Sequence, residues 1–240
     1  MNMTKLLYLH DHYMKEFEAE VTKVDGKYVV LDKSCFYPQS GGQVTDFGVI
    51  KRDDEEFKVV FVKKIGDDLS HEVDRKGLKV GDKVKSVLDW ERRYKLMRVH
   101  TAAHIISEVI HKETGALITG NQLDIDKVRI DFSLENFNKD KLLEYINKAN
   151  EIIDEDLQIE VEFMEREEAM KLPQVSKLAM GLPEYIKEVR IVRIGDFDMQ
   201  ADGGTHVKST KEIGELEFVK AENKGKNNRR VYFRLKTQLI

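Results

Sequence analysis

The sequence predicts an α+β protein of two parts. A small β-barrel-like domain is expected over residues 1–88, and an α+β domain with helices on an antiparallel sheet over residues 89–240. Up to about residue 88, short alternating segments are separated by glycine turns, which is typical of strands. Beyond residue 88, two long segments have apolar residues at helical spacing, and strand-like segments follow them.

The first part is expected to contain short strands at close spacing, which favours a small barrel or a curled sheet. Asp25-Gly26 is a typical hairpin turn, and Gly66 and Gly81 mark further turns. Residues 34–43 are rich in small and turn-forming residues and do not alternate, so they are predicted to form a loop. The expected strands are residues 17–24, 27–31, 44–51, 57–62 and 83–88.

The second part begins with a long expected helix. Asp89 can cap it, Glu91 lies in its first turn, and Gly115 ends it. Its apolar stripe consists of Leu96, Val99, Ala103, Ile106 and Ile110. A second helix is expected over residues 139–154 and a short one over residues 165–171. The expected strands are residues 128–132, 159–163, 189–194, 214–220 and 230–235.

Composition limits the classes of function. Hydrophobic residues make up 41% of the chain, enough for a sizeable core, and the net charge of −4 does not attract nucleic acid to the chain as a whole. No stretch is long and apolar enough for a signal peptide or a membrane span, so a cytoplasmic protein without a membrane partner is expected. The single cysteine, Cys35, excludes an internal disulfide and is interpreted as a small buried residue.

The first candidate site is the pair His100 and His104 on the long helix. Residues four apart lie on one face of a helix, so both imidazoles can reach one ion at the ~2.0–2.1 Å typical of zinc–nitrogen bonds. Such a pair also occurs often by chance. A zinc peptidase would need Glu directly after the first His, and this chain has Thr101 there.

The second candidate site is the segment from Asp202 to His206. Gly203 and Gly204 lie between them and can form a tight turn that brings the carboxylate and the imidazole towards one point. An ordinary hairpin turn would have the same composition. Together with the helical pair, this segment gives three His and one Asp, which suits one tetrahedral zinc ion.

A basic stretch lies near the C-terminus. Residues 220–236 contain seven Lys or Arg residues and one Glu, a net charge of +6. Such a stretch can contact phosphates without reading sequence, and it can equally be a solvated hairpin.

Three motifs in a set order give the chain a family resemblance. The motifs are the glycine-rich loop of residues 36–43, the segment from His100 to His104, and the segment from Gly203 to Val207. In this order they resemble the editing region of alanyl-tRNA synthetase. More closely they resemble the free-standing AlaX proteins, in the medium-length form with an N-terminal glycine-rich domain. The resemblance spans nearly the whole chain and includes nothing like an amino-acid activation domain.

The resemblance implies an aminoacyl-tRNA deacylase that acts on mischarged alanine tRNA. It implies serine as the amino acid removed, with glycine as a second candidate, and one zinc ion per chain held by His100, His104, Asp202 and His206. The glycine-rich loop with Gly41, Gly42 and Gln43, together with Thr101, would contact the aminoacyl end. The basic stretch, through Lys226, Arg229 and Arg230, would contact the tRNA backbone.

This chain departs from the family pattern at Asp202, where the second motif commonly begins with Cys. Asp is a legitimate zinc ligand, and the change makes the site harder. Asp202 is favoured here as a ligand, with orientation of His206 from behind as the alternative. Ala103 is a milder departure, since the helical motif often has Thr there. No protein general base can be chosen from the sequence, and the oligomeric state stays open.

A second class of function must be weighed against the hydrolase. The chain could be a non-catalytic RNA-binding module with a purely structural metal ion, and Asp202 in place of Cys would fit a lost activity. Structural zinc sites usually favour thiolates, however, and the candidate site has none. The hydrolase is therefore the preferred interpretation.

Overall fold

The computed structural model describes residues 3–135, 138–172, 175 and 187–236. The chain divides into two compact units, residues 1–97 and residues 98–240, and the boundary falls within the long helix α1 (Trp90–Thr114). The predicted fold class is confirmed, because a closed barrel is followed by helices and antiparallel sheets. Among the described residues, no helix is long and apolar enough to cross a membrane.

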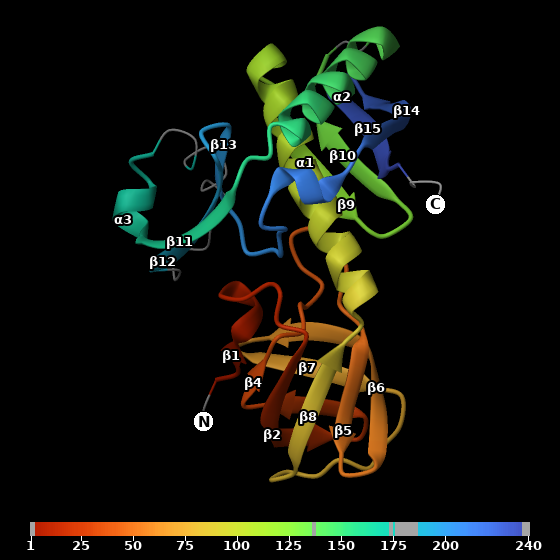
Figure 1. Cartoon of the computed structure of the whole chain (residues 1–240), viewed down its shortest axis with the longest axis vertical. Helices are drawn as coiled ribbons and strands as arrows, with labels where there is room; N and C mark the ends of the chain where they lie inside the picture. The colour runs from red at the N-terminus through yellow and green to blue at the C-terminus, as the bar shows by residue number, and fades with distance from the viewer. Residues whose placement is uncertain (1–2, 136–137, 173–174, 176–186, 237–240) are drawn as a thin grey trace. The chain divides into compact units, whose positions relative to one another are not determined.

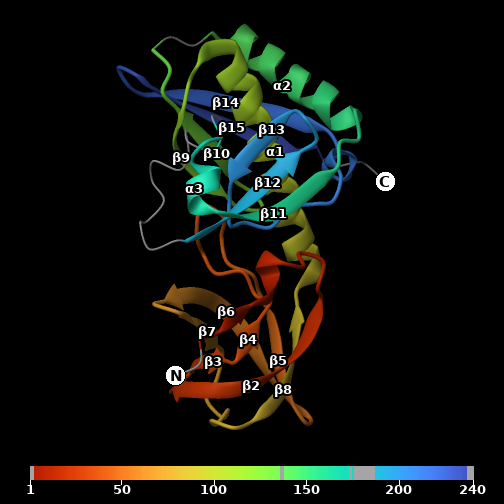
Figure 2. The ribbon, with the colours of Figure 1, turned by 90° about the vertical axis from the view of Figure 1, so that its left-hand side faces the viewer.

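The first unit is a closed six-stranded barrel with the strand order β2-β3-β7-β6-β5-β8 (Figure 2). All the pairs that close it are antiparallel. The short strands β1 (Lys5–Leu6) and β4 (Lys33–Ser34) pair in parallel beside it, and the 3-10 helix η1 (Leu7–Leu9) follows β1. The barrel strands are β2 (Glu16–Asp25), β3 (Tyr28–Leu31), β5 (Gly48–Arg52), β6 (Glu55–Ile65), β7 (Asp68–Val73) and β8 (Lys83–Leu88).

Alternation along the strands fills the barrel. In β2, Phe17, Ala19 and Val21 are buried while the residues between them are more exposed, as expected for a strand with one face on a core. Cys35 lies fully buried in this core, as predicted. Burial raises the pKa of its thiol to about 12, so the thiol stays protonated and unreactive at neutral pH.

The first unit differs from the prediction in the bounds of one strand and in strands that were not expected, among them β7 and the two-residue strands β1 and β4. The strand expected over residues 44–51 begins only at Gly48, because Thr45 and Asp46 are buried polar residues that bond to the loop instead of pairing in a ladder. Asp46 accepts a hydrogen bond from the backbone of Tyr37 at 2.7 Å. Strand β7 was not predicted, since its buried positions include the polar residues Ser70 and His71.

A buried ion pair fixes the glycine-rich loop within this unit. Arg93 and Asp46 are both fully buried and bond to each other through Nε and Nη2 of the guanidinium. The same guanidinium donates to the carbonyls of His12 and Cys35, at 3.1 and 2.5 Å. Because Asp46 also holds the backbone of Tyr37, one charged group ties together three segments of the unit.

His71 is a second buried polar group of the barrel. Its Nε2 lies 2.8 Å from the hydroxyl of Ser34, and its Nδ1 lies 3.0 Å from the carbonyl of Val29. A carbonyl only accepts, so Nδ1 carries the proton, and Nε2 accepts from the hydroxyl. Burial lowers the pKa of His71 to about 4, and the ring is neutral at physiological pH.

We expect this histidine to make the first unit sensitive to acid. Unfolded chains bind a proton at histidine near pH 6.5. The folded barrel does so only near pH 4, so the free energy of unfolding should fall as the pH drops from 6.5 to 4 and level off below. Urea titrations between pH 7 and 4 measure this slope. His71→Gln should show a smaller acid loss than the wild type, and equal slopes would contradict the assignment.

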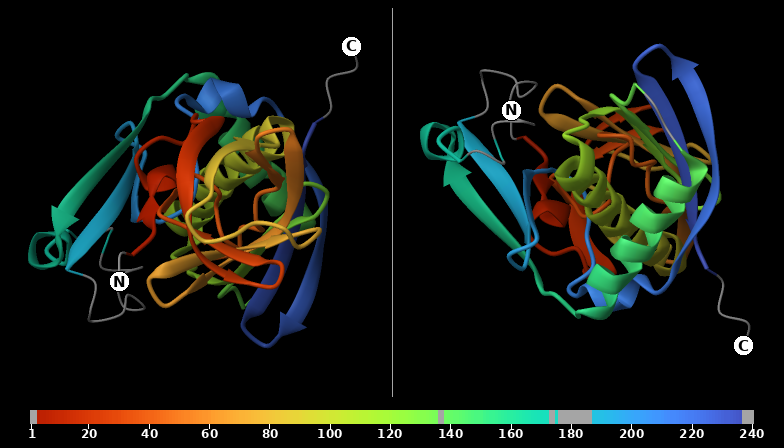
Figure 3. Two further views of the ribbon diagram at one scale, coloured as in Figure 1. Left: turned by 90° about the horizontal axis from the view of Figure 1, so that it is seen from below. Right: turned by 90° about the horizontal axis from the view of Figure 1, so that it is seen from above.

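The second unit places α1 between two sheets (Figures 1 and 3). A four-stranded antiparallel sheet has the order β14-β15-β10-β9, and α1 and α2 (Lys139–Asp154) lie on the same face of it. A three-stranded antiparallel sheet, β11-β12-β13, lies on the other side of α1. The short helices α3 (Arg166–Ala169) and η2 (Thr210–Ile213) complete the described elements. The strands are β9 (Ile118–Leu123), β10 (Val128–Phe132), β11 (Ile159–Glu165), β12 (Glu188–Ile194), β13 (Asp198–Ala201), β14 (Leu216–Gly225) and β15 (Asn228–Leu235).

The helices begin where their caps predict. The backbone of Arg92 donates to the carboxylate of Asp89 before α1, and the backbone of Asp140 donates to the side chain of Asn138, the N-cap of α2. Gly115 follows the last residue of α1 with a φ of 72°, a conformation that favours glycine. Every residue from 99 to 107 of α1 is buried, as expected for a helix covered on more than one side.

Candidate metal centre

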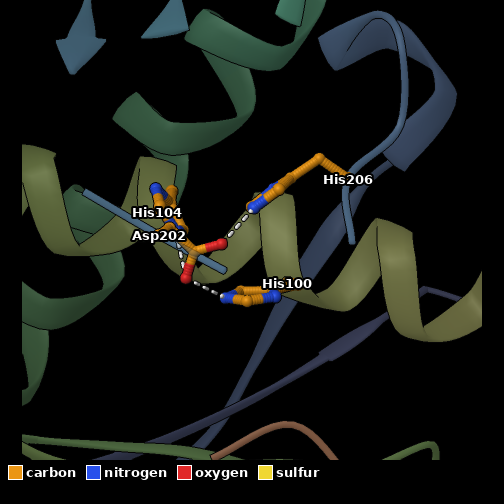
Figure 4. A group of neighbouring side chains, drawn as sticks. All are labelled: His100, His104, Asp202 and His206. Carbon is orange, nitrogen blue, oxygen red and sulfur yellow. Dashed lines mark hydrogen bonds and ion pairs between the residues drawn. The ribbon is translucent and has the colours of Figure 1, made fainter. Parts of the chain in front are cut away.

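Three imidazoles and one carboxylate converge within the second unit. One ligand atom each from His100, His104, Asp202 and His206 can be chosen so that all four lie within 4.8 Å of one another. The carboxylate of Asp202 lies between the three rings (Figure 4). Its oxygens lie 2.9 Å from Nε2 of His206, 3.5 Å from Nε2 of His100 and 4.0 Å from Nε2 of His104.

Two elements far apart in the sequence bring these groups together. His100 and His104 occupy successive turns of one face of α1, and their ring centroids are 5.2 Å apart. Asp202 directly follows β13, and His206 lies in the loop that leads to η2. The ring of His206 is 4.5 Å from that of His100 and 4.8 Å from that of His104.

Hydrogen bonds at the far side of two rings set which nitrogen faces the centre. Nδ1 of His104 lies 3.2 Å from a carboxylate oxygen of Asp198, and Nδ1 of His206 lies 3.2 Å from the hydroxyl of Thr101. Nε2 of each ring is therefore the nitrogen directed at Asp202. Metal-binding histidines usually have such a partner on the other nitrogen.

The pKa values follow from burial and from mutual charge. Burial lowers the pKa of His100 to about 4 and that of His206 well below its ordinary value. Burial would also lower the pKa of His104, but the hydrogen bond to Asp198 and the charge of Asp202 outweigh it and raise that pKa. Burial opposes ionisation of Asp202, yet the neighbouring imidazoles hold its pKa well below its usual range.

The loop that carries Asp202 and His206 is held at several points. The carboxylate of Asp202 accepts from the backbone of Gly204 at 2.5 Å, and Arg190 donates to the Asp202 carbonyl at 2.6 Å. Downstream, Arg98 of α1 donates to the carbonyl of Ile213 at 2.7 and 3.0 Å. The loop is therefore fixed to α1 and to β12 by charged side chains.

Gly204 allows this loop to approach α1 closely. A Cβ at this position would lie 2.0 Å from Cε1 and 2.3 Å from Nδ1 of His100. Real Cβ atoms do not approach ring atoms so closely, so any side chain here would displace His100. Glycine is required for space, since its φ is not in the left-handed region.

These four residues could hold a metal ion. A tetrahedron with bonds of about 2.1 Å places its ligands about 3.4 Å apart. The distances from Asp202 to the three imidazoles, 2.9 to 4.0 Å, bracket that value, and all four ligand atoms lie within 4.8 Å of one another. Two of the three imidazoles have lowered pKa values, so their lone pairs are available at neutral pH, as metal binding requires. The donors are nitrogen and oxygen, without sulfur.

The other predicted site residues lie in different surroundings. Gly41 and Gly42 have φ angles of 57° and 88° and form a two-residue turn between Ser40 and Gln43, whose backbones exchange two hydrogen bonds. Gln43 is buried. Thr101, predicted to contact substrate, is fully buried. Its hydroxyl is within hydrogen-bond distance of Nδ1 of His206 and accepts a hydrogen bond from the backbone N–H of Val207.

The three predicted tRNA-binding residues belong to the β14–β15 hairpin, Lys226 in its turn and Arg229 and Arg230 in β15, and they differ in exposure. Lys226 is exposed. Arg229 is buried and donates to the carbonyls of Gly225 and Asn228, among others. Arg230 bonds through both Nε and Nη2 to Asp131, at 2.7 and 2.8 Å. The two arginines thus already stabilise the sheet and the turn.

Two residues around the centre, Asp198 and Arg190, were not predicted from the sequence. Both are charged residues at buried positions of strands, in β13 and β12. A charged residue at a buried position of a mainly apolar strand, as Arg190 is in residues 189–194, is a signal that could have been noticed. Asp198 gave a weaker one, because β13 is short and polar and was not recognised as a strand.

Two known families match this chain, one in each of its two units. The family described as "tRNA synthetases class II (A)" matches residues 3–92. The family described as "Threonyl and Alanyl tRNA synthetase second additional domain" matches residues 189–232, which include Asp202 and His206. The two matches place the chain among the relatives of the alanyl-tRNA and threonyl-tRNA synthetases.

Individual relatives narrow this class. The alanyl-tRNA editing protein AlaX-M of Methanosarcina barkeri is 52% identical over 97% of this chain and 99% of its own length. That of Saccharolobus solfataricus is 46% identical over 98% of this chain and 100% of its own length. The alanine–tRNA ligase of Pyrococcus abyssi is 37% identical over 91% of this chain but only 24% of the ligase. The chain belongs to the AlaX-M family of alanyl-tRNA editing proteins, and the resemblance drawn from its three motifs is confirmed.

Proposed function

We propose that this chain is a zinc-dependent deacylase that frees alanine tRNA from a wrongly attached amino acid. The expected substrate is seryl-tRNA(Ala), with glycyl-tRNA(Ala) as a second candidate. The observation that carries the proposal is the convergence of His100, His104, Asp202 and His206 in a chain that is similar over 97% of its length to an alanyl-tRNA editing protein.

The proposal answers a physical need for editing. A pocket shaped for alanine cannot strongly exclude the smaller glycine, and it rejects an added hydroxyl only weakly. Discrimination by binding alone therefore leaves errors, and a second site that hydrolyses the wrong ester removes them.

The geometry supports Asp202 as a fourth ligand. A residue that only oriented a histidine would contact its Nδ1, but Asp202 faces the Nε2 atoms, and the Nδ1 positions of His104 and His206 are taken by Asp198 and Thr101. A set of only four donors, three nitrogen atoms and one oxygen atom, suits zinc. When bound, zinc supplies a Lewis acid that can activate water or hold the aminoacyl group.

The chain's own residues have separate tasks in this proposal. The three imidazoles and Asp202 hold the ion, while Thr101 and Asp198 keep two of the rings in place. By family resemblance, Gly41, Gly42 and Gln43 contribute to the aminoacyl pocket, and a glycine turn supports this because it lets a ligand approach the backbone closely.

Contact with the tRNA backbone is proposed for the β14–β15 hairpin. Lys226 is the exposed cation among the three residues predicted for this contact, whereas Arg229 and Arg230 have carbonyl or carboxylate partners within the unit. We therefore assign the direct phosphate contact first to Lys226, and the shape of the turn to the two arginines.

Deacylation assays test the proposal. Seryl-, glycyl- and alanyl-tRNA(Ala) are incubated with the wild type, with chelator-treated and zinc-restored protein, and with His104→Ala. Metal polarisation contributes several kcal/mol to such reactions, so chelation and His104→Ala should slow seryl ester hydrolysis by at least about 10²-fold. His111→Ala is the matched control on the same helix and should keep full activity, because His111 lies outside the cluster and bonds to the carbonyl of Ala116.

The same assays separate the alternative function. A metal-loaded wild type that binds the tRNA but hydrolyses none of the three esters would favour a non-catalytic RNA-binding module. Hydrolysis that persists after complete metal removal would contradict the role of the ion.

A further inference from the structure

We infer that Asp198 is a positioning residue of the metal centre, holding His104 with Nε2 directed at the ion. The inference rests on the metal site of the proposed function. Asp198 does not belong to the cluster that could hold the ion and lies on the far side of His104 from it.

The hydrogen bond between the two residues has a defined direction. An ionised carboxylate only accepts, so the 3.2 Å contact between Asp198 Oδ2 and His104 Nδ1 places a proton on Nδ1. A neutral imidazole with its proton on Nδ1 has its lone pair on Nε2, the nitrogen that faces Asp202. Asp198 therefore selects the tautomer that can bind a metal at this centre.

Asp198 is itself held in place. Its side chain is only 2% exposed, and Gln200 donates to both of its oxygens, at 3.1 and 3.0 Å. Gln200 belongs to the same strand, so the carboxylate cannot turn away from His104 without losing these bonds.

The turn before Asp198 is fixed to the helix that carries His104. Lys112, two turns along α1 from His104, donates to the carbonyl of Phe197 at 2.7 Å and lies 4.1 Å from the centre of its ring. One helix thus determines both the position of the imidazole and that of the segment that supplies its partner.

The hydrogen-bond partner on Nδ1 also affects how strongly each imidazole binds a metal ion. A charged acceptor on the far nitrogen raises the basicity of a metal-binding imidazole, and a neutral hydroxyl does so less. His104, bonded to Asp198, should therefore be a stronger ligand than His206, which is bonded to Thr101. Loss of Asp198 should weaken the metal site even though all four ligands remain.

Measurements of zinc affinity test the positioning role of Asp198 independently of hydrolysis. Zinc dissociation constants are measured by competition with a chelator for wild type, Asp198→Ala, Asp198→Asn and the control Asp196→Asn, an exposed residue of the same turn. Asp198→Ala should bind zinc about 10–100-fold more weakly. Asp198→Asn should lose less, because an amide oxygen still accepts from Nδ1–H, and Asp196→Asn should match the wild type.

Two further measurements distinguish positioning from general damage. Cobalt-loaded Asp198→Asn should show an altered visible spectrum while its thermal midpoint stays near that of Asp196→Asn, so the inference remains testable if the alanine variant does not fold. A wild type that takes up no metal would overturn the proposed function, and the inference with it. A wild type that binds zinc, with Asp198→Ala equal to the control, would overturn the inference alone.

Discussion

Replacement of Gly204 by alanine is expected to abolish high-affinity metal binding and, with it, the proposed deacylation. The added Cβ would occupy the space of the His100 ring, at 2.0 Å from Cε1, so either the ring or the loop must move. The loop has little freedom, because Asp202 and Ile213 are tied to Arg190 and Arg98. Displacing a ligand should weaken binding more than the ~10–100-fold expected when only the partner of a ligand is lost.

The adjacent glycine provides a matched control for this prediction. Gly203 is exposed, and a Cβ built on it meets nothing within 4 Å. Zinc affinity and seryl-tRNA(Ala) hydrolysis should therefore be unchanged in Gly203→Ala and lost in Gly204→Ala, with both proteins folded by circular dichroism. Equal zinc affinity in the two variants would show that the loop can rearrange around His100.

Removal of the buried cation Arg93 is expected to cause the largest loss of stability in the first unit. Arg93→Met leaves the carboxylate of Asp46 without its ion partner and removes the hydrogen bonds that Arg93 donates to the carbonyls of His12 and Cys35. Breaking a fully buried pair in this way costs about 3–5 kcal/mol. Urea unfolding followed by the fluorescence of Trp90, the single tryptophan of the chain, measures this free energy.

An exposed ion pair and a double variant complete that experiment. Lys85→Met breaks the 2.9 Å pair with Glu16, whose side chains are 49% and 59% exposed, and should cost no more than about 1 kcal/mol. Combining Arg93→Met with Asp46→Leu should recover part of the loss, because no buried charge then lacks a partner. A cost as small for Arg93→Met as for Lys85→Met would contradict the structural role given to the pair.

The parts of the fold that local rules determine could be predicted from the sequence. The helix over residues 139–154 was predicted at its observed bounds, because apolar residues recur on one face, and in the structure Asn138 caps it. Strands β1, β4, β7, β9 and β13 were missed, and in β7 and β13 a buried polar residue has its hydrogen-bond partner far along the chain. His71 bonds to Ser34, 37 residues away, and Asp198 bonds to His104, 94 residues away. No pattern within a short window contains such a partner.

The candidate site, too, was predicted where local patterns apply and missed where it depends on partners distant in the sequence. Helical spacing places His100 and His104 on one face, but it does not indicate which other segment meets them. The number and type of donor residues suggested that Asp202 and His206 join them, the family resemblance strengthened that prediction, and the structure brings the four residues together. Local patterns also gave no sign that the hydroxyl of Thr101, which the resemblance implies as a substrate contact, lies 3.2 Å from Nδ1 of His206.

The separation of the ligands along the chain also bears on how the second unit folds. An ion bound to His104 and Asp202 would join two points 98 residues apart in sequence (202 − 104) and so close a long loop of the polypeptide. Closing a loop of about 100 residues removes on the order of 4–5 kcal/mol of chain entropy from the unfolded state when the link is covalent. The ion would thus act as a reversible cross-link, and the availability of the metal would influence the stability of the folded second unit as well as the proposed deacylation.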